Sequence, residues 1–197
     1  MATARKTSTR LTKSNAPVYQ LRIELVDVQP EVWRTVLIPG SATLTKVHAT
    51  ILWGMGWEGG HLHEFTIGYE AYGMPDPDFD DGRPIKLEGR YTLAGAVGTL
   101  KSFRYVYDFG DSWEHVIKVE KILPPDPNLK APLCIGGANA CPPQDCGGPL
   151  GYEEFLEAIA DPKHEDHDDM LTWCGGSFDP AAFDLAIINA NLGKIKL

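Results

Sequence analysis

The sequence predicts a single α+β domain, in which a mainly antiparallel sheet packs against helices that are concentrated toward the C-terminus. Short segments of the first 123 residues alternate apolar and polar side chains, which is typical of half-buried strands. The last 50 residues instead repeat apolar side chains at helical spacing. A chain of 197 residues with 43% hydrophobic residues suits one core. We therefore assign residues 18–197 to one domain and residues 1–17 to a disordered basic tail.

The N-terminal part of the domain reads as a hairpin followed by a helix. Alternation over residues 18–28 resumes at 32–38 after a proline, which predicts two strands. Apolar residues then recur every three or four positions from Leu44 to Met55, and a glycine-rich stretch ends this helix. Residues 61–69 alternate again as a strand, and residues 71–84 are rich in Pro, Asp and Gly, which predicts a loop.

The clearest hairpin lies in the middle of the chain. Residues 103–109 and 113–122 alternate as strands, joined by a tight Gly-Asp-Ser turn, with the aromatic residues of the first strand on one face. Residues 123–150 read as a long irregular segment. A helix follows and ends at Asp161, and a last helix is expected to start with Asp179 as its N-cap.

Composition and charge exclude several classes of protein. No apolar run reaches the ~20 residues that a membrane helix needs. The tail holds four of the 18 basic residues and none of the 27 acidic ones, so the acidic body should repel nucleic-acid phosphate. Four cysteines without a secretion signal indicate a reducing cytoplasm, where clustered thiols are metal ligands, reactive groups or buried apolar residues more often than disulfides. We therefore expect a cytoplasmic protein.

Three cysteines lie in one segment that is rich in glycine and proline. Cys134, Cys141 and Cys146 occur within CIGGANACPPQDCGGPLGY, without the paired two-residue spacing of a zinc ribbon. They are candidate ligands for zinc, since glycine and proline can bend a loop around an ion. The alternative is that they are small buried residues in a braced loop.

Three histidines form a second candidate metal site. His61 and His63 lie two apart on a predicted strand and so share a face, and His115 follows the hairpin turn near Asp108 and Asp111. Such a set of imidazoles and a carboxylate would suit a catalytic metal with an open position. The alternative is that the histidines are half-buried sheet residues that hydrogen-bond to their neighbours.

The hairpin turn DFGDSWEH also supplies candidate binding residues. Carboxylates such as Asp108 and Asp111 are able to act in acid–base chemistry. Asp beside a turn glycine also commonly bonds the local backbone, so Asp111 is expected to hold the turn and Trp113 to anchor it to the core. The sequence contains no phosphate-binding glycine loop and no common hydrolase signature.

Four strings, HLHEFTIGYEAYG, YVYDFGDSWEH, CIGGANACPPQDCGGPLGY and WCGGSFDPAAFD, occur in this order. In these strings the chain resembles the plasmid pRiA4b ORF-3-like family, from about Tyr19 to Leu192. The resemblance implies a small α+β fold and a bacterial or archaeal source, often linked to plasmids or insertion elements. It implies no proven reaction. Where the family generally has Pro-Pro-Glu-Asp, this chain has Gln144 before Asp145, so Asp145 is the better candidate for a charge-dependent role.

Three functional hypotheses follow. The first is a non-enzymatic binding or accessory module for a protein or small ligand, with Asp108, Asp111, Trp113, His115 and Asp145 as candidate binding residues. The second is a metal-dependent, hydrolytic enzyme that uses the His/Asp site. The third is a DNA-associated accessory protein that acts through its basic tail.

Overall fold

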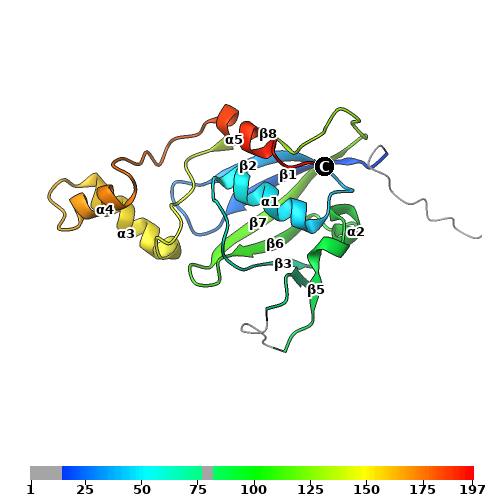
Figure 1. The fold of residues 1–197 in the computed structure, drawn as a ribbon, viewed down its shortest axis with the longest axis horizontal. Coiled ribbons are helices and arrows are strands. Elements are labelled where there is room, and N and C mark those ends of the chain that lie inside the picture. The colour runs from blue at the N-terminus through cyan, green and yellow to red at the C-terminus, as the bar shows by residue number, and fades with distance from the viewer. Residues whose placement is uncertain (1–14, 77–81) are drawn as a thin grey trace, which may run out of the picture.

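The computed structural model describes residues 15–76 and 82–197, and its centre is a twisted, eight-stranded sheet (Figure 1). The strands are β1 (Val18–Leu25), β2 (Trp33–Pro39), β3 (His63–Ile67), β4 (Glu70–Gly73), β5 (Ile85–Leu87), β6 (Ser102–Tyr107), β7 (Trp113–Leu123) and β8 (Leu133–Ala138). Their order is β5-β4-β3-β6-β7-β1-β2-β8. Every neighbouring pair is antiparallel except β4 and β5, which confirms the α+β class.

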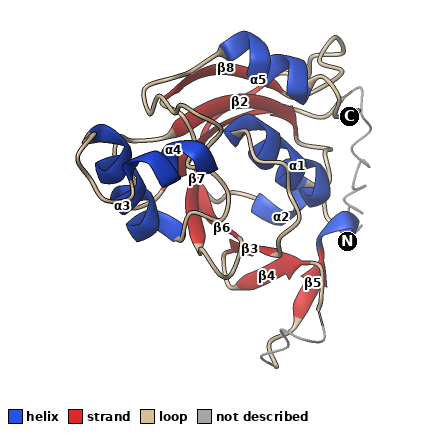
Figure 2. Ribbon diagram, turned by 60° about the vertical axis from the view of Figure 1, so that its left-hand side comes forward, coloured by secondary structure: helices blue, strands red, loops and turns tan. Residues whose placement is uncertain are grey.

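Helices cover the sheet and extend beyond one end of it. They are α1 (Leu44–Met55), α2 (Leu93–Val97), α3 (Gly148–Ala160), α4 (His167–Trp173) and α5 (Leu185–Leu192), with a 3-10 turn, η2 (Glu88–Arg90). Figures 1 and 2 show α1 lying across the sheet, α5 beside β8, and α3 and α4 together as a separate layer. The long connection from β8 to α3 therefore crosses the end of the central strands.

The central strands owe their stability to alternating buried side chains. Leu21 and Ile23 of β1 are almost fully buried, and Phe103, Tyr105 and Tyr107 of β6 all face the core, as the sequence predicted. Aromatic rings bury large areas and pack edge to face, so this row contributes much of the core. The 103–109 and 113–122 hairpin is thus confirmed as β6 and β7.

Two strands lie where the sequence predicted loops. β4, which begins at Glu70, covers the first three residues of the predicted loop 71–84, and β8 falls within the segment 123–150. β8 carries two glycines, which have low strand propensity, and β4 is a four-residue strand next to the sheet edge. In β8 a Cβ on Gly137 would lie 2.4 Å from the Phe183 ring, so glycine is required for the C-terminal segment to cover this edge.

The last helix starts later than predicted. α5 begins at Leu185, and the Asp184 carboxylate caps it by accepting from the backbone N–H of Ala186 and Ile187. Asp179 instead accepts from the Ala181 N–H in a preceding turn. Both aspartates accept from the backbone N–H two residues later. Only Asp184 also accepts from the N–H three residues later, as a helix N-cap does.

The domain begins slightly before the predicted boundary. Ala16 is buried, and the Pro17 carbonyl accepts from the Gly40 N–H at 2.7 Å. The predicted tail is therefore folded at its last two residues, whereas residues 1–14 lie outside the described residues. Across the described ranges, no helix combines the length and apolar character needed to cross a membrane.

Candidate functional site

Three side chains from distant parts of the chain meet at one end of the central strands. His61 precedes β3, Asp108 directly follows β6, and Asp145 lies in the loop between β8 and α3. His61 Nδ1 is 3.2 Å from Asp108 Oδ2, and His61 Nε2 is 3.3 Å from Asp145 Oδ1. The imidazole therefore lies between two carboxylates, one at each ring nitrogen.

The hairpin turn fixes the position of Asp108. Its N–H donates to the Leu62 carbonyl at 2.8 Å, and its Oδ1 accepts from the Gly110 N–H at 2.9 Å. The other oxygen, Oδ2, is left to face His61. The aspartate that holds the turn is thus Asp108, whereas the sequence pattern favoured Asp111.

Both carboxylates at His61 come from residues with a left-handed backbone. The φ angle is 57° at Asp108 and 60° at Asp145. Aspartate tolerates this region better than most residues, but the conformation persists only where the surroundings enforce it. Asp27, Ser112 and Asn139 adopt the same conformation elsewhere in the described residues, so the local turns account for it at Asp108 and Asp145 as well.

Gln144 and Pro142 brace the loop that carries Asp145. The Trp57 indole N–H donates to the Pro142 carbonyl at 2.9 Å. The Gln144 amide accepts from the Glu58 N–H at 2.8 Å and donates to the Gly59 carbonyl at 3.3 Å and the Tyr107 hydroxyl at 3.2 Å. A carboxylate could not donate to the Gly59 carbonyl, so Gln144 acts here as a neutral clamp rather than as an acid.

Asp111 connects the hairpin turn to the start of α3. Its Oδ2 accepts from the Gly147 N–H at 3.3 Å. At Gly148, where φ is +73°, a Cβ would lie 2.4 Å from the Asp111 carbonyl oxygen. This close approach sets the position of the cysteine-containing loop, and hence of Asp145, against the hairpin.

His63 does not join His61 but belongs to a buried polar network. Its Nε2 is 2.8 Å from Glu88 Oε2, and its ring stacks on His48 with centroids 3.5 Å apart. The His48 Nδ1 is 2.7 Å from the Tyr105 hydroxyl. Burial, together with the charge of His63, lowers the pKa of His48 to about 3. Burial is the largest influence on Glu88 and acts to raise its pKa. The hydrogen bonds to His63 and Thr45, with the charges of His63 and His48, together outweigh burial, so the pKa is lowered.

His115 and Trp113 lie in the core rather than at the site. Each is 1% exposed, and the His115 ring packs edge to face on Trp57 with centroids 5.5 Å apart. His115 Nδ1 is 3.0 Å from the Trp113 carbonyl oxygen, so this nitrogen carries the proton. Burial lowers the pKa of His115 to about 4. The structure therefore does not bring His61, His63 and His115 together.

The loop cysteines also do not form a cluster of three ligands. Cys134 is buried in β8, where its N–H donates to the Asn189 side chain at 2.8 Å. Burial raises the pKa of Cys141, and burial with the charge of Asp111 raises the pKa of Cys146 to about 12. Such thiols are protonated at neutral pH. Over residues 15–76 and 82–197, the one group of three candidate ligands in close reach is His61, Asp108 and Asp145.

The three-residue cluster of His61, Asp108 and Asp145 has the chemistry of a metal site. One ligand atom from each residue lies within 4.8 Å of the other two. The two carboxylates face different nitrogens of the ring, so an ion held by all three residues requires the His61 ring or one carboxylate to turn. Imidazole and carboxylate together suit first-row divalent ions such as zinc. The side chains of His61 and Asp145 are 32% and 69% exposed, and both line a shallow cleft of about 600 Å³.

The sequence placed His61 with Asp108 or Asp111 in one predicted His/Asp site, but it named Asp145 only separately. Local spacing favours pairing His61 with His63, whereas the structure pairs it with residues 47 and 84 positions away. The sequence also did not point to His48 and Glu88, because a histidine inside an amphipathic helix and a glutamate in a short turn carry no local signal.

Comparisons with known proteins place the chain among relatives of similar length. The model of the family described as plasmid pRiA4b ORF-3-like protein matches residues 17–187. An uncharacterized protein of Sinorhizobium fredii, y4hQ, is 42% identical over 177 residues, which are 88% of this chain and 90% of that protein. The crystal structure of a protein of unknown function, MM3350 of Methanosarcina mazei, is 34% identical with a TM-score of 0.79, covering 87% of this chain and 97% of that one.

Proposed function

The chain belongs to the plasmid pRiA4b ORF-3-like family, and for this member we propose a binding function centred on a divalent metal ion held by His61, Asp108 and Asp145. The ion would be zinc or a similar first-row metal. The observation that carries the proposal is the convergence of one imidazole and two carboxylates on one another from three separate segments.

The surroundings of the cluster support this proposal over a purely structural ion pair. Two carboxylates are held beside one imidazole, and like charges kept this close repel one another. A bound divalent ion would offset this repulsion. The clamp formed by Gln144 would keep the loop fixed while the ion binds.

A second candidate function, metal-assisted hydrolysis, is favoured by the number of ligands. Structural zinc sites usually have four protein ligands, whereas catalytic sites have three and leave a position for water or substrate. The cluster offers three and adjoins the cleft that Trp57, Pro143 and Phe178 help to line. A ligand in this cleft would meet the open position of the ion.

Metal content and metal titration test the proposed site. Protein purified without chelator is expected to carry about one equivalent of a first-row divalent metal per chain by elemental analysis. After chelation, calorimetric titration should return one site. Loss of even an indirect ligand contact commonly costs 10–100-fold in affinity, so Asp145→Asn and His61→Ala should each weaken binding by at least about 100-fold.

Asp169→Asn provides the matched control, because Asp169 is an exposed aspartate of α4 that is not part of the cluster. It should bind metal like the parent protein. The proposal fails if the chelated protein binds no first-row metal, or if Asp145→Asn and Asp169→Asn have the same affinity.

A further inference from the structure

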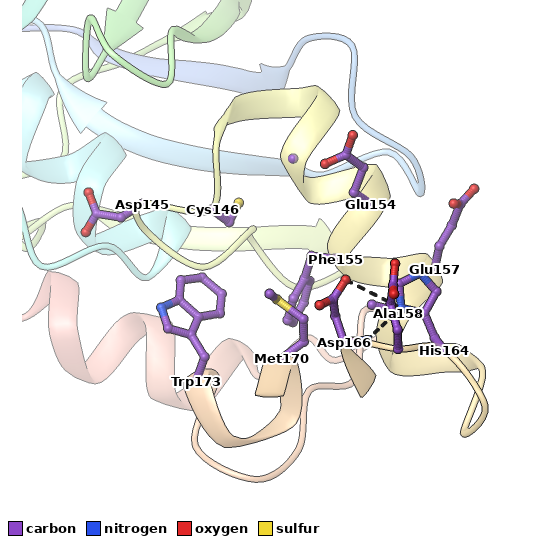
Figure 3. Close-up of a pocket in the computed structure, with 12 residues that line it drawn as sticks. Asp145, Cys146, Glu154, Phe155, Glu157, Ala158, His164, Asp166, Met170 and Trp173 are labelled. Atoms are coloured by element: carbon purple, nitrogen blue, oxygen red, sulfur yellow. Dashed lines mark hydrogen bonds and ion pairs between the residues drawn. The ribbon is translucent and has the colours of Figure 1, made fainter. Parts of the chain in front are cut away.

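A second cleft, of about 510 Å³, lies between α3 and α4 (Figure 3). Its floor is apolar: Phe155 comes from α3, and Met170 and Trp173 come from α4. The Phe155 and Trp173 rings meet edge to face with centroids 5.7 Å apart. Trp173 is nevertheless 47% exposed, so a large aromatic face remains uncovered in the cleft.

The rim of this cleft is strongly acidic. Five carboxylates line it, from Asp145, Glu154, Glu157, Glu165 and Asp166, against a single histidine, His164. Figure 3 shows Asp145 at one end of the cleft and Glu157 and Asp166 toward the other. His164 Nδ1 lies 3.9 Å from Asp166 Oδ2. Within residues 15–76 and 82–197, no lysine or arginine forms an ion pair with any of these five carboxylates.

Apart from His164 and Cys146, the ionisable side chains that line the cleft are all carboxylates. Cys146 lies in the cleft wall, and burial together with the charges of Asp111 and Asp145 raises the pKa of its thiol. The five carboxylates that line the cleft favour a cation there. An apolar floor with an exposed indole inside an acidic rim matches a ligand that carries positive charge on an apolar stem.

We propose that the cleft between α3 and α4 binds a basic peptide segment of a partner protein, with an arginine side chain stacked on Trp173 and its neighbouring cations paired with Glu154 and Glu157. Arginine fits better than lysine because its planar guanidinium stacks on aromatic faces and its stem packs on apolar surface. Of the acidic residues only Asp145 is shared with the metal cluster, so the cleft extends from that cluster but does not depend on it.

Fluorescence anisotropy with a labelled arginine decapeptide tests this proposal. The chelated protein should bind the peptide saturably, and a lysine decapeptide should bind about 3-fold more weakly because it lacks guanidinium stacking. Trp173→Ala should weaken binding of the arginine peptide by about 3- to 5-fold. The double variant Glu154→Gln/Glu157→Gln should weaken it by about 3- to 10-fold.

Glu153→Gln is the matched control, since Glu153 is an exposed glutamate of the same helix that does not line the cleft. It should change binding by less than 2-fold, and thermal unfolding should show that all variants fold. The proposal is wrong if no saturable binding occurs, or if Glu153→Gln weakens binding as much as the double variant does, because the peptide would then only sense the acidic body. Using chelated protein keeps the outcome separate from that of the metal site.

Discussion

Arg34 is a buried cation whose hydrogen-bond partners, among the described residues, are backbone carbonyls. It is 2% exposed, and its guanidinium donates to the carbonyls of Gly54, Ala138 and Asn139, as well as to that of Trp33. Burial lowers its pKa, and the fork of donors joins β2, the end of α1 and β8. One side chain thus fixes the edge from which the cysteine-containing loop departs.

Removing this cation should therefore be costly. Arg34→Met leaves several buried carbonyls without a donor, so the free energy of unfolding should fall by about 3 kcal/mol in urea denaturation. Arg104→Met is the control, because Arg104 is 65% exposed and its pair with Glu114 should contribute less than about 1 kcal/mol. Equal losses for the two variants would contradict the assigned role of Arg34.

The buried histidines make stability depend on pH. His115 has its pKa lowered from 6.5 to about 4, so the unfolded chain takes up a proton at a pH where the folded chain does not. The contribution of His115 to the free energy of unfolding is fully present above pH 6.5 and is lost as the pH falls toward 4. His48 acts in the same direction. Each should contribute a slope approaching 1.4 kcal/mol per pH unit in this window.

Urea denaturation at pH 7, 6, 5 and 4 measures this slope. His115→Gln should lower it by about 1 kcal/mol per unit, because the amide cannot take up a proton in the unfolded chain. An unchanged slope in His115→Gln would show that this ring is already charged in the folded protein.

At the scale of elements, the start of α3 is docked on the β6–β7 turn through glycine. Gly147 and Gly148 both have positive φ, but only at Gly148 would a Cβ meet the Asp111 backbone, at 2.4 Å. Gly147→Ala should therefore cost about 1–2 kcal/mol for the backbone conformation alone. This docking brings Asp145 to His61.

Gly148→Ala should be more disruptive than its neighbour. The clash adds about 1–3 kcal/mol of overpacking, and it should also weaken metal binding by displacing Asp145. Paired thermal unfolding and calorimetric titration of Gly147→Ala and Gly148→Ala measure both effects. If the two variants unfold alike and bind metal alike, the close approach does not position the site.

Prediction from sequence succeeded where local patterns determine the element. The β6–β7 hairpin and α1 follow from side-chain periodicity, because their buried faces repeat at strand or helix spacing. β8 could not be found in this way, since its Gly137 admits the ring of Phe183, which lies 46 residues later in the chain. Edge strands of this kind depend on tertiary packing more than on propensity.

At the scale of the whole molecule, the fold brings the conspicuous motifs to one end of the sheet. The hairpin supplies Asp108, the histidine string supplies His61, and the cysteine segment supplies Asp145. Each motif was visible in the sequence, but contacts between residues so far apart depend on strand order, which local patterns do not determine. The cysteines that made the third motif conspicuous serve its packing, while its aspartate faces the site.

The acidic character of the domain is consistent with this arrangement. The chain has a net charge of −9, and the metal cluster and the α3–α4 cleft both concentrate carboxylates around Asp145. Both proposed ligands are cations. The molecule is thus better suited to attract positive groups than phosphates.

Anomalous diffraction from a crystal grown with zinc tests the central claim most directly. Data collected on both sides of the zinc absorption edge should give one strong peak, roughly 2.0–2.2 Å from a His61 ring nitrogen and from carboxylate oxygens of Asp108 and Asp145. A map with no peak at these residues, or with zinc bound only at the loop cysteines, would contradict the account.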